Sequence, residues 1–244
     1  TPKGIVASRR NMAETVARSL DVLSLTADDR LLFHPPLHYS GSITLFEPLY
    51  AGCSSFIMSD QEVLFPDVVA GIIEKHGITV WQGAASFLRA LVEGGNLERR
   101  QLASVRFFDF FGERLPVAIV ERAQRHFRKA HFCNTYGASE AFWMTRYDEP
   151  RPPGAKSELP IGEPYGAFKL SLLDRQGREV DAGETGEICV EGPVLLDSYW
   201  RDPEATRVRA YDASVEKGAE LVKGPYVAET FKVSVEQNYV VVEI

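Results

Sequence analysis

The sequence predicts an α/β fold in which helices cover a mostly parallel sheet, followed by a smaller β-rich section. Short apolar runs alternate with amphipathic helical segments over residues 1–150, which is typical of parallel sheets covered on both faces. After residue 150 the chain becomes proline-rich and charged, and then shows short alternating runs typical of antiparallel strands. We therefore expect an α/β core at 1–150, a β-rich part at 151–210 and a divergent β-hairpin tail at 211–244.

The individual elements follow from hydrophobic spacing and from residues that start or stop helices. Pro66 in a first turn and Gly77 just after a last turn mark one helix clearly. Apolar residues at helical spacing predict helices at residues 11–25, 42–52, 65–77, 85–95 and 116–129. Short apolar runs predict buried strands at residues 29–33, 54–59, 78–83, 104–112 and 130–137. Later strand-like runs occupy residues 168–174, 186–192, 231–236 and 239–244.

Composition and charge narrow the class of protein. The chain has 244 residues, of which 45% are hydrophobic and 25% charged, so we expect a folded globular protein. A net charge of -7 argues against a nucleic-acid partner, and the cations at 122–129 fit a solvated helix face better than a binding patch. No apolar stretch approaches ~18 residues, so no membrane partner is expected either.

The cysteines and the first residues bear on where the protein works. Cys53, Cys133 and Cys189 lie far apart without metal-ligand spacing, so we expect small core residues in a reducing, cytoplasmic environment. The chain begins without a signal-peptide pattern and without methionine, which indicates a piece of a longer chain.

In sheets of the predicted kind, ligands bind outside the carboxyl ends of the strands. We therefore expect chemistry in the loops after Phe33, Phe111 and Cys133. The last of these loops belongs to the stretch "HFCNTYGASEAF", which places a polar turn after a buried strand.

That polar turn has two interpretations. Gly137 would permit an unusual backbone angle or the close approach of a ligand. Ser139 and Glu140 together suit a phosphate oxygen and a hard cation such as Mg²⁺, and Tyr136 offers a flat face to a base. The spacing fits equally well a strand-to-helix turn in which Ser139 caps the helix.

Six segments in order resemble the motifs of the adenylate-forming superfamily, which includes acyl-CoA synthetases and the adenylation domains of nonribosomal peptide synthetases. The heptapeptide "NTYGASE" is similar to that family's Asn-x-Tyr-Gly-x-Thr/Ser-Glu signature. The other family-like segments are "TPKGIV" at 1–6, "PPLHYSG" at 35–41, "FGERLP" at 111–116, "LPIGEP" at 159–164 and residues 183–206. Together they extend over nearly all of the chain, to about residue 210.

The resemblance implies an acid–thiol ligase. In that family a carboxylate attacks the α-phosphate of ATP, and pyrophosphate leaves with Mg²⁺. The acyl group then passes to CoA or to the phosphopantetheine of a carrier protein. The implied cofactors are ATP and Mg²⁺, and the implied partners are a small-molecule carboxylic acid and a thiol acceptor.

The same resemblance assigns roles to individual residues. The implied catalytic residues are Lys3, His38 and Ser139. The implied nucleotide-binding residues are Gly112, Glu113, Asn134, Thr135, Tyr136, Gly137 and Ser139. Glu140 would bind Mg²⁺, and the wall of the acyl pocket would include His38, Tyr39 and Trp81.

Plainer interpretations of four of these residues stay open. His38 also fits a half-buried loop histidine, and Trp81 fits an ordinary core residue. Glu113 fits a solvated loop acid, and Lys3 fits a frayed chain end.

The sequence also departs from the family pattern. The chain begins inside the phosphate loop, and after residue 210 neither the ribose-binding Asp segment nor the lysine-bearing domain follows. The alternative is therefore a non-catalytic nucleotide- or acyl-binding fragment, or an interaction module. The tail faintly resembles the last strands of Rieske-type ferredoxins, but it lacks their Cys and His pairs, so no iron–sulfur site is expected. The stretch "HYSGS" lacks an acid, which favours a substrate without an α-amino group.

Overall fold

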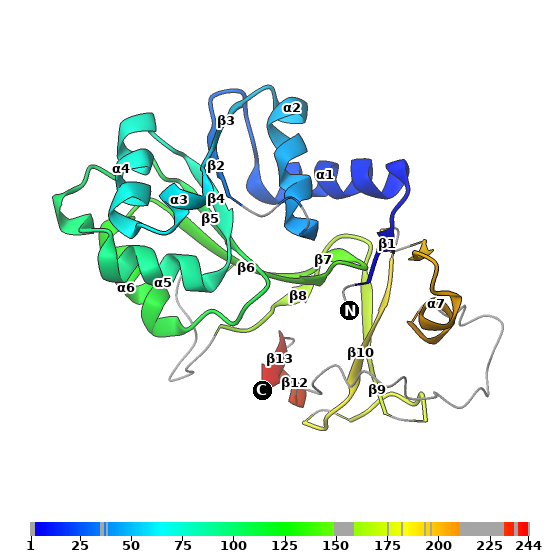
Figure 1. Ribbon diagram of the computed structural model, residues 1–244. Helices are drawn as coiled ribbons and strands as arrows, with labels where there is room; N and C mark the ends of the chain where they lie inside the picture. Colours follow the sequence, from blue (N-terminus) through cyan, green and yellow to red (C-terminus); the bar gives the residue numbers. More distant parts are fainter. Residues whose placement is uncertain are drawn as a thin grey trace.

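The structure is a computed structural model that describes residues 3–34, 37, 39–148, 159–174, 176–181, 183–192, 194–195, 197–209, 232–236 and 239–243. A 7-stranded sheet in the order β3-β2-β4-β5-β6-β7-β8 forms its centre (Figure 1). Strands β3, β2, β4, β5 and β6 run parallel, whereas β7 and β8 are antiparallel. The strands are β2 Arg30–Phe33, β3 Ser54–Ile57, β4 Val80–Gly83, β5 Phe107–Phe110, β6 His131–Ala138, β7 Phe142–Tyr147 and β8 Glu163–Pro164. The predicted fold class is confirmed.

Helices cover both faces of this sheet. These helices are α1 Arg9–Leu23, α2 Glu47–Ala51, α3 Asp60–Val63, α4 Pro66–His76, α5 Ala85–Gly94 and α6 Val117–His126, with 3₁₀ segments at Ser40–Phe46 and Leu97–Arg99. A further helix, α7 Pro203–Arg209, lies with the later β elements (Figure 1). Figure 1 shows α3 to α6 grouped on one side of the sheet, and α1 with α2 on the other. As predicted, Pro66 opens α4 and Gly77 ends it in the left-handed conformation, with φ of 59°.

The segment 42–52, expected as one helix, is only partly α-helical. Its first half is the 3₁₀ segment, and α2 begins only at Glu47. The reason is Pro48, which has no backbone N–H to donate to the carbonyl of Thr44. Instead the N–H of Glu47 donates to that carbonyl in the tighter 3₁₀ pattern.

The strands bury alternate residues on opposite faces. Leu32, Trp81 and Phe108 pair side by side across neighbouring strands and pack with the apolar residues of α4, α5 and α6. Their chain neighbours Leu31, Val80 and Phe107 pack instead with Val22 and Leu23 of α1. The period of two along a strand produces this division. Because both faces of these strands are buried, their sequences are continuous apolar runs.

The polar turn after β6 joins two antiparallel strands. Strand β6 continues to Ala138, residues 139–141 turn, and β7 runs back beside it. The interpretation of Ser139 as a helix cap is therefore wrong. Gly137 has an ordinary negative φ, but a Cβ there would stand 1.6 Å from the carbonyl oxygen of Phe142. Gly137 thus permits the close approach of the Phe142 carbonyl. Phe142 itself adopts the left-handed conformation, with φ of 53°, which is unfavourable for a bulky residue.

Smaller β elements follow the main sheet. Strand β9 Lys169–Leu173 pairs with β10 Glu187–Glu191, and β12 Lys232–Glu236 pairs with β13 Tyr239–Glu243. A pairing that the sequence did not predict joins β1 Ile5–Val6 to β11 Ser198–Tyr199. It brings the first residues of the chain beside the later β-rich section. Among the described residues, no helix combines the length and the apolar character that a membrane crossing requires.

Candidate nucleotide and metal site

The β1–β11 pairing places Lys3 and Tyr199 beside the turn between β6 and β7, which carries Ser139 and Glu140. The hydroxyl of Tyr199 on β11 donates a 2.5 Å hydrogen bond to Oε1 of Glu140. The ammonium of Lys3, two residues before β1, lies 4.8 Å from the centre of the Tyr199 ring. On the other side of the turn, the Ser139 hydroxyl donates to the Ser40 hydroxyl at 2.9 Å. A cation, a carboxylate and three hydroxyls, from four segments that are distant in the sequence, therefore meet here.

The main chain supports Lys3 in this position. Besides the strand register, in which Ile5 faces Tyr199, the N–H of Trp200 donates to the carbonyl of Gly4 at 2.7 Å. A Cβ on Gly4 would already lie 3.0 Å from that of Trp200. This packing argues against the interpretation of Lys3 as part of a frayed chain end. Its action on phosphates stays a prediction.

Asn134 and Thr135 lie buried in β6 and bond inside the protein. The Asn134 amide donates to the carbonyl of Pro160 at 2.8 Å. The Thr135 hydroxyl lies 2.9 Å from Oδ1 of Asp109 and 3.2 Å from the carbonyl of Phe110. These contacts fix the end of β6 against β5 and the segment before β8. A direct nucleotide contact by either side chain stays a prediction.

Tyr136 and Gly137 end β6 at a bulge. The register between β6 and β7 shifts between these two residues. The half-buried Tyr136 ring packs against the cluster of Ala141, Met144, Phe168 and Val194, and burial raises the pKa of its hydroxyl. The bulge turns the strand end and so re-aims the residues after it, including Ser139 and Glu140. Base stacking on Tyr136 stays a prediction.

Gly112 and Glu113 follow β5 at the same edge of the sheet. Gly112 is exposed with φ of 81°, and no atom lies within 4 Å of the position of a Cβ. The Glu113 carboxylate accepts from the backbone N–H of Ser86 at 2.8 Å and from the Ser86 hydroxyl at 3.0 Å. Glu113 is therefore exposed but anchored to the first turn of α5, whose open N–H groups favour a carboxylate.

The structure describes two of the three predicted acyl-pocket residues, Tyr39 and Trp81. His38 lies outside the described residues, and Tyr39 has 53% of its surface exposed. Trp81 is only 1% exposed and packs edge-on against Phe108, with ring centres 5.5 Å apart. Its placement favours the core interpretation over a pocket wall.

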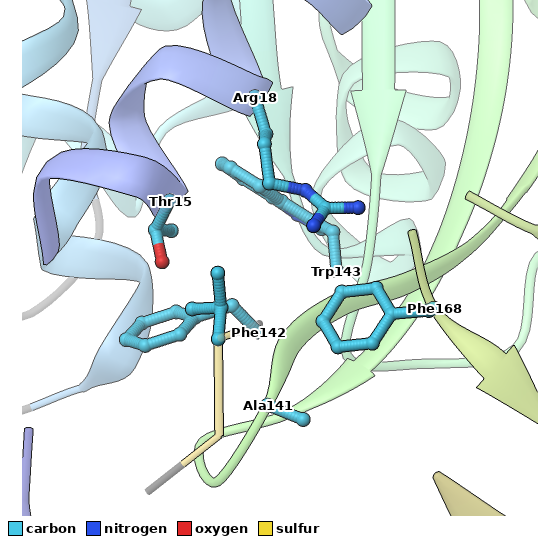
Figure 2. Close-up of a pocket in the computed structure, with 7 residues that line it drawn as sticks. Thr15, Arg18, Ala141, Phe142, Trp143 and Phe168 are labelled. Atoms are coloured by element: carbon cyan, nitrogen blue, oxygen red, sulfur yellow. The ribbon is translucent and has the colours of Figure 1, made fainter. Parts of the chain in front are cut away.

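A small pocket lies behind the turn and faces α1. Figure 2 shows Thr15 and Arg18 of α1 on one side and Ala141, Phe142 and Phe168 on the other, with the side chain of Trp143 overlapping Arg18 in this view. The Arg18 guanidinium is 4.5 Å from the Phe168 ring centre and donates to the carbonyl of Tyr165 at 2.6 Å. The lining contains none of the predicted site residues, and the arginine is already engaged. This pocket is therefore a packing feature beside the site.

The sequence did not predict a set of buried, hydrogen-bonded polar side chains near the carboxyl ends of the strands. Gln82 and Asp109 pair across β4 and β5, and the Gln82 amide lies 3.5 Å from Asp109 and 3.4 Å from Glu47 of α2. The Ser19 hydroxyl of α1 also donates to Glu47. Burial, opposed by these hydrogen bonds, raises the pKa of Glu47 to about 8 and that of Asp109 to about 7. The sequence signal that could have indicated these residues is a polar residue inside an apolar run, such as Asp109 within "FFDFF".

The donor chemistry at the turn fits Mg²⁺. Magnesium takes hard oxygen ligands and is commonly held by one or two carboxylates, with substrate phosphates and water completing its shell. Glu140 supplies one carboxylate with Ser139 beside it, and Oε1 of Glu140 is held by Tyr199. Among the described residues no cluster of three or more His, Cys, Asp and Glu could hold a metal by itself. A site shared with a phosphate is the arrangement that fits.

Comparisons with known proteins identify the family of the chain. Residues 1–200 match the family model described as AMP-binding enzyme. The chain is 30% identical over 84% of its length to medium/long-chain-fatty-acid–CoA ligase FadD8 of Mycobacterium tuberculosis, covering 35% of that protein. It is 31% identical over 91% of its length to an L-proline–[L-prolyl-carrier protein] ligase of Streptomyces coelicolor, covering 42% of it.

The fold has solved counterparts as well. The AMPPNP-bound crystal structure of the nonribosomal peptide synthetase FmoA3 superposes with a TM-score of 0.78 at 27% identity. That match covers 84% of this chain and 22% of the synthetase. The chain thus spans less than half the length of each of these relatives.

Proposed function

Because the chain belongs to the AMP-binding enzyme family, we propose that it is the nucleotide-binding part of an acid–thiol ligase. In the proposed reaction a carboxylate oxygen attacks the α-phosphorus of ATP, the bond to pyrophosphate breaks, and an acyl-adenylate forms. A thiolate of CoA or of a carrier-protein phosphopantetheine then attacks the acyl carbon, and AMP leaves. Relatives named as CoA and carrier protein ligases support both acceptors.

The observation that carries the proposal is that Tyr199 contacts both Lys3 and Glu140, at the turn that also carries Ser139. Joining a carboxylate to a polyphosphate brings anions together, so the site must neutralise charge and present fixed donors. Bound Mg²⁺ would stabilise the charge on the phosphates. Glu140 would hold that ion, Ser139 would donate to a phosphate oxygen, and Lys3 would pair with the departing phosphates. Tyr136, with Asn134, Thr135 and Gly137, would adjoin the adenine opposite Gly112 and Glu113.

For the acid itself, we propose a carboxylic acid without an α-amino group. The support is the stretch "HYSGS", which offers no carboxylate to pair with an ammonium. His38 and the exposed Tyr39 would adjoin this acid. The two named relatives differ here, since one is named for fatty acids and the other for proline. Exchange assays with matched acids that carry or lack the amino group test this part.

The cytoplasm is the proposed setting. Cys53 and Cys133 are free thiols, which suits a reducing compartment. The alternative of a non-catalytic fragment is not favoured by the comparisons, whose named relatives are ligases.

The deciding experiment is carboxylate-dependent ATP–pyrophosphate exchange in a longer chain that contains these residues together with the family segments absent from the sequence. Glu140→Ala should abolish the exchange, because the carboxylate that holds the metal is gone. Glu121→Ala on the exposed face of α6 is the matched control and should leave it unchanged. Exchange that survives Glu140→Ala at the original rate would remove Glu140 from the mechanism.

A further inference from the structure

Tyr199 contacts both charged residues of the candidate site. Its ring is 4% exposed and lies under the ammonium of Lys3, at 4.8 Å from ring centre to nitrogen. That distance is within the range of a cation–π interaction. Its hydroxyl donates to Glu140 at 2.5 Å, the length of a hydrogen bond to a charged oxygen. One side chain therefore touches the cation at its face and the anion at its edge.

The backbone of Tyr199 is held from two directions. On one side β11 pairs with β1, and the N–H of Asp197 donates to the carbonyl of Val6 at 2.9 Å. On the other side the N–H of Tyr199 donates to the Thr206 hydroxyl of α7 at 2.9 Å. The ring thus projects from a fixed main chain, whereas Glu140 sits in a turn.

We propose that Tyr199 is a positioning residue that orients the Glu140 carboxylate for a divalent cation while it holds Lys3 beside it. This inference rests on the proposed function, because it assumes that Glu140 is the metal ligand. By engaging Oε1, the phenol leaves Oε2 to face the cation and removes rotations of a flexible side chain. Hydrogen-bonding partners of metal ligands affect metal affinity by about 10–100-fold.

The test measures the affinity of this chain for ATP by calorimetry, first with chelator and then with saturating Mg²⁺. The ratio of the two dissociation constants reports how strongly metal and nucleotide support each other. Tyr199→Phe removes only the hydroxyl and keeps the ring under Lys3. We expect metal-free binding within about twofold of the wild type and binding with Mg²⁺ weakened about tenfold.

The structure offers a matched control. The phenol of Tyr165 also donates to a carboxylate, that of Asp21, at 2.5 Å, but away from the turn. Tyr165→Phe should leave the Mg²⁺ effect unchanged. In a Glu140→Ala background the Mg²⁺ effect should already be absent, and Tyr199→Phe should then add nothing.

The outcomes separate the two proposals. If the wild type binds ATP no better with Mg²⁺, the metal role of Glu140 fails, and the inference about Tyr199 falls with it. If the Mg²⁺ effect is present and depends on Glu140 but survives in Tyr199→Phe, only the positioning role is overturned. If Tyr199→Phe weakens ATP binding equally with and without Mg²⁺, Tyr199 has only a structural role. Thermal unfolding of each variant accompanies the titrations.

Discussion

Glu47 and Asp109, both buried, face the same side-chain amide, that of Gln82. The two acids come from α2 and β5 and lie beneath the sheet edge where the candidate site is built. Burial raises the pKa of both above ordinary values, to about 8 for Glu47 and about 7 for Asp109. Near neutral pH Glu47 therefore keeps its proton in the folded state, where the unfolded chain would release it.

This relationship predicts that stability falls as pH rises. Between the ordinary Glu47 pKa of 4.5 and the folded value of about 8, the folded state binds more protons than the unfolded state. The stabilising contribution is therefore complete below pH 4.5 and is lost as pH rises toward 8. Glu47→Gln keeps the shape and removes the titration, so its stability should depend less steeply on pH across this window. Urea unfolding at several pH values measures the slope.

Asp109 still titrates in that variant, so the slope should be reduced rather than abolished. Glu121→Gln on the exposed face of α6 serves as the control and should follow the wild type. Parallel curves for the wild type and Glu47→Gln would show that the Glu47 proton is not linked to folding.

An ion pair on the same side of the sheet predicts the opposite pH dependence. Asp29 receives two bonds from Arg106, at 2.8 and 2.7 Å, and one from the Thr79 hydroxyl at 2.7 Å. Burial opposes ionisation, but these donors outweigh it and hold the Asp29 pKa well below its usual value. Its contribution is therefore present above an ordinary aspartate pKa and is lost as pH falls below that value.

Asp29→Asn should lower the free energy of unfolding at pH 7 by roughly 2 kcal/mol, a typical value for hydrogen bonds to a charged group. The loss relative to wild type should shrink in acid, because the unfolded wild-type chain then binds a proton at Asp29 and the contribution of the charged group to wild-type stability falls. Its exposed neighbour supplies the comparison, because Asp28→Asn should change stability little. An equal loss at pH 7 and pH 3 would contradict the charge-based explanation.

The sequence was informative about the sheet because its signal is local. Apolar runs such as "ITVWQG" and "FFDFF", separated by helices with clear stops such as Gly77, predict parallel strands without knowledge of their partners. The β1–β11 pair could not be predicted in this way. Strands of two residues carry no periodic pattern, and their pairing depends on parts of the chain that meet only after folding.

The candidate site also has a part that the sequence predicts and a part that depends on tertiary contacts. Lys3, Ser139 and Glu140 follow from a resemblance of short motifs, which names residue types but not their contacts. The hydroxyl of Tyr199 on Glu140 and the carboxylate of Glu113 on α5 are tertiary contacts. The choice between hairpin and helix after β6 was likewise decided by a backbone approach, that of Phe142 to Gly137.

That approach makes a prediction for Gly137→Ala. The added methyl would stand 1.6 Å from the Phe142 carbonyl oxygen, so β6 and β7 must separate at the bulge. We expect lower stability, by about 1–3 kcal/mol as for other overpacked sites, and weaker ATP binding because Ser139 and Glu140 move with the turn. Thermal unfolding and calorimetry measure the two effects.

Gly71→Ala in α4 is the comparison. Its Cβ would meet nothing closer than 3.5 Å, from the Arg100 guanidinium, and alanine favours a helix by about 1 kcal/mol. That variant should match or exceed wild-type stability and bind ATP normally. If Gly137→Ala behaves like Gly71→Ala, the hairpin does not need a glycine at this position.

Glu113 offers a way to separate a structural role from a nucleotide-binding role. Glu113→Ala removes both bonds to the first turn of α5 and should lower stability by about 1 kcal/mol, as for other lost helix caps. Ser86→Ala removes only the hydroxyl bond and leaves the backbone N–H in place, so its effect should be smaller. If Glu113 also borders the nucleotide, Glu113→Ala should weaken ATP binding at a temperature where both variants are folded, whereas Ser86→Ala should not. Equal ATP affinity in both variants and the wild type would leave Glu113 as an anchor of α5 alone.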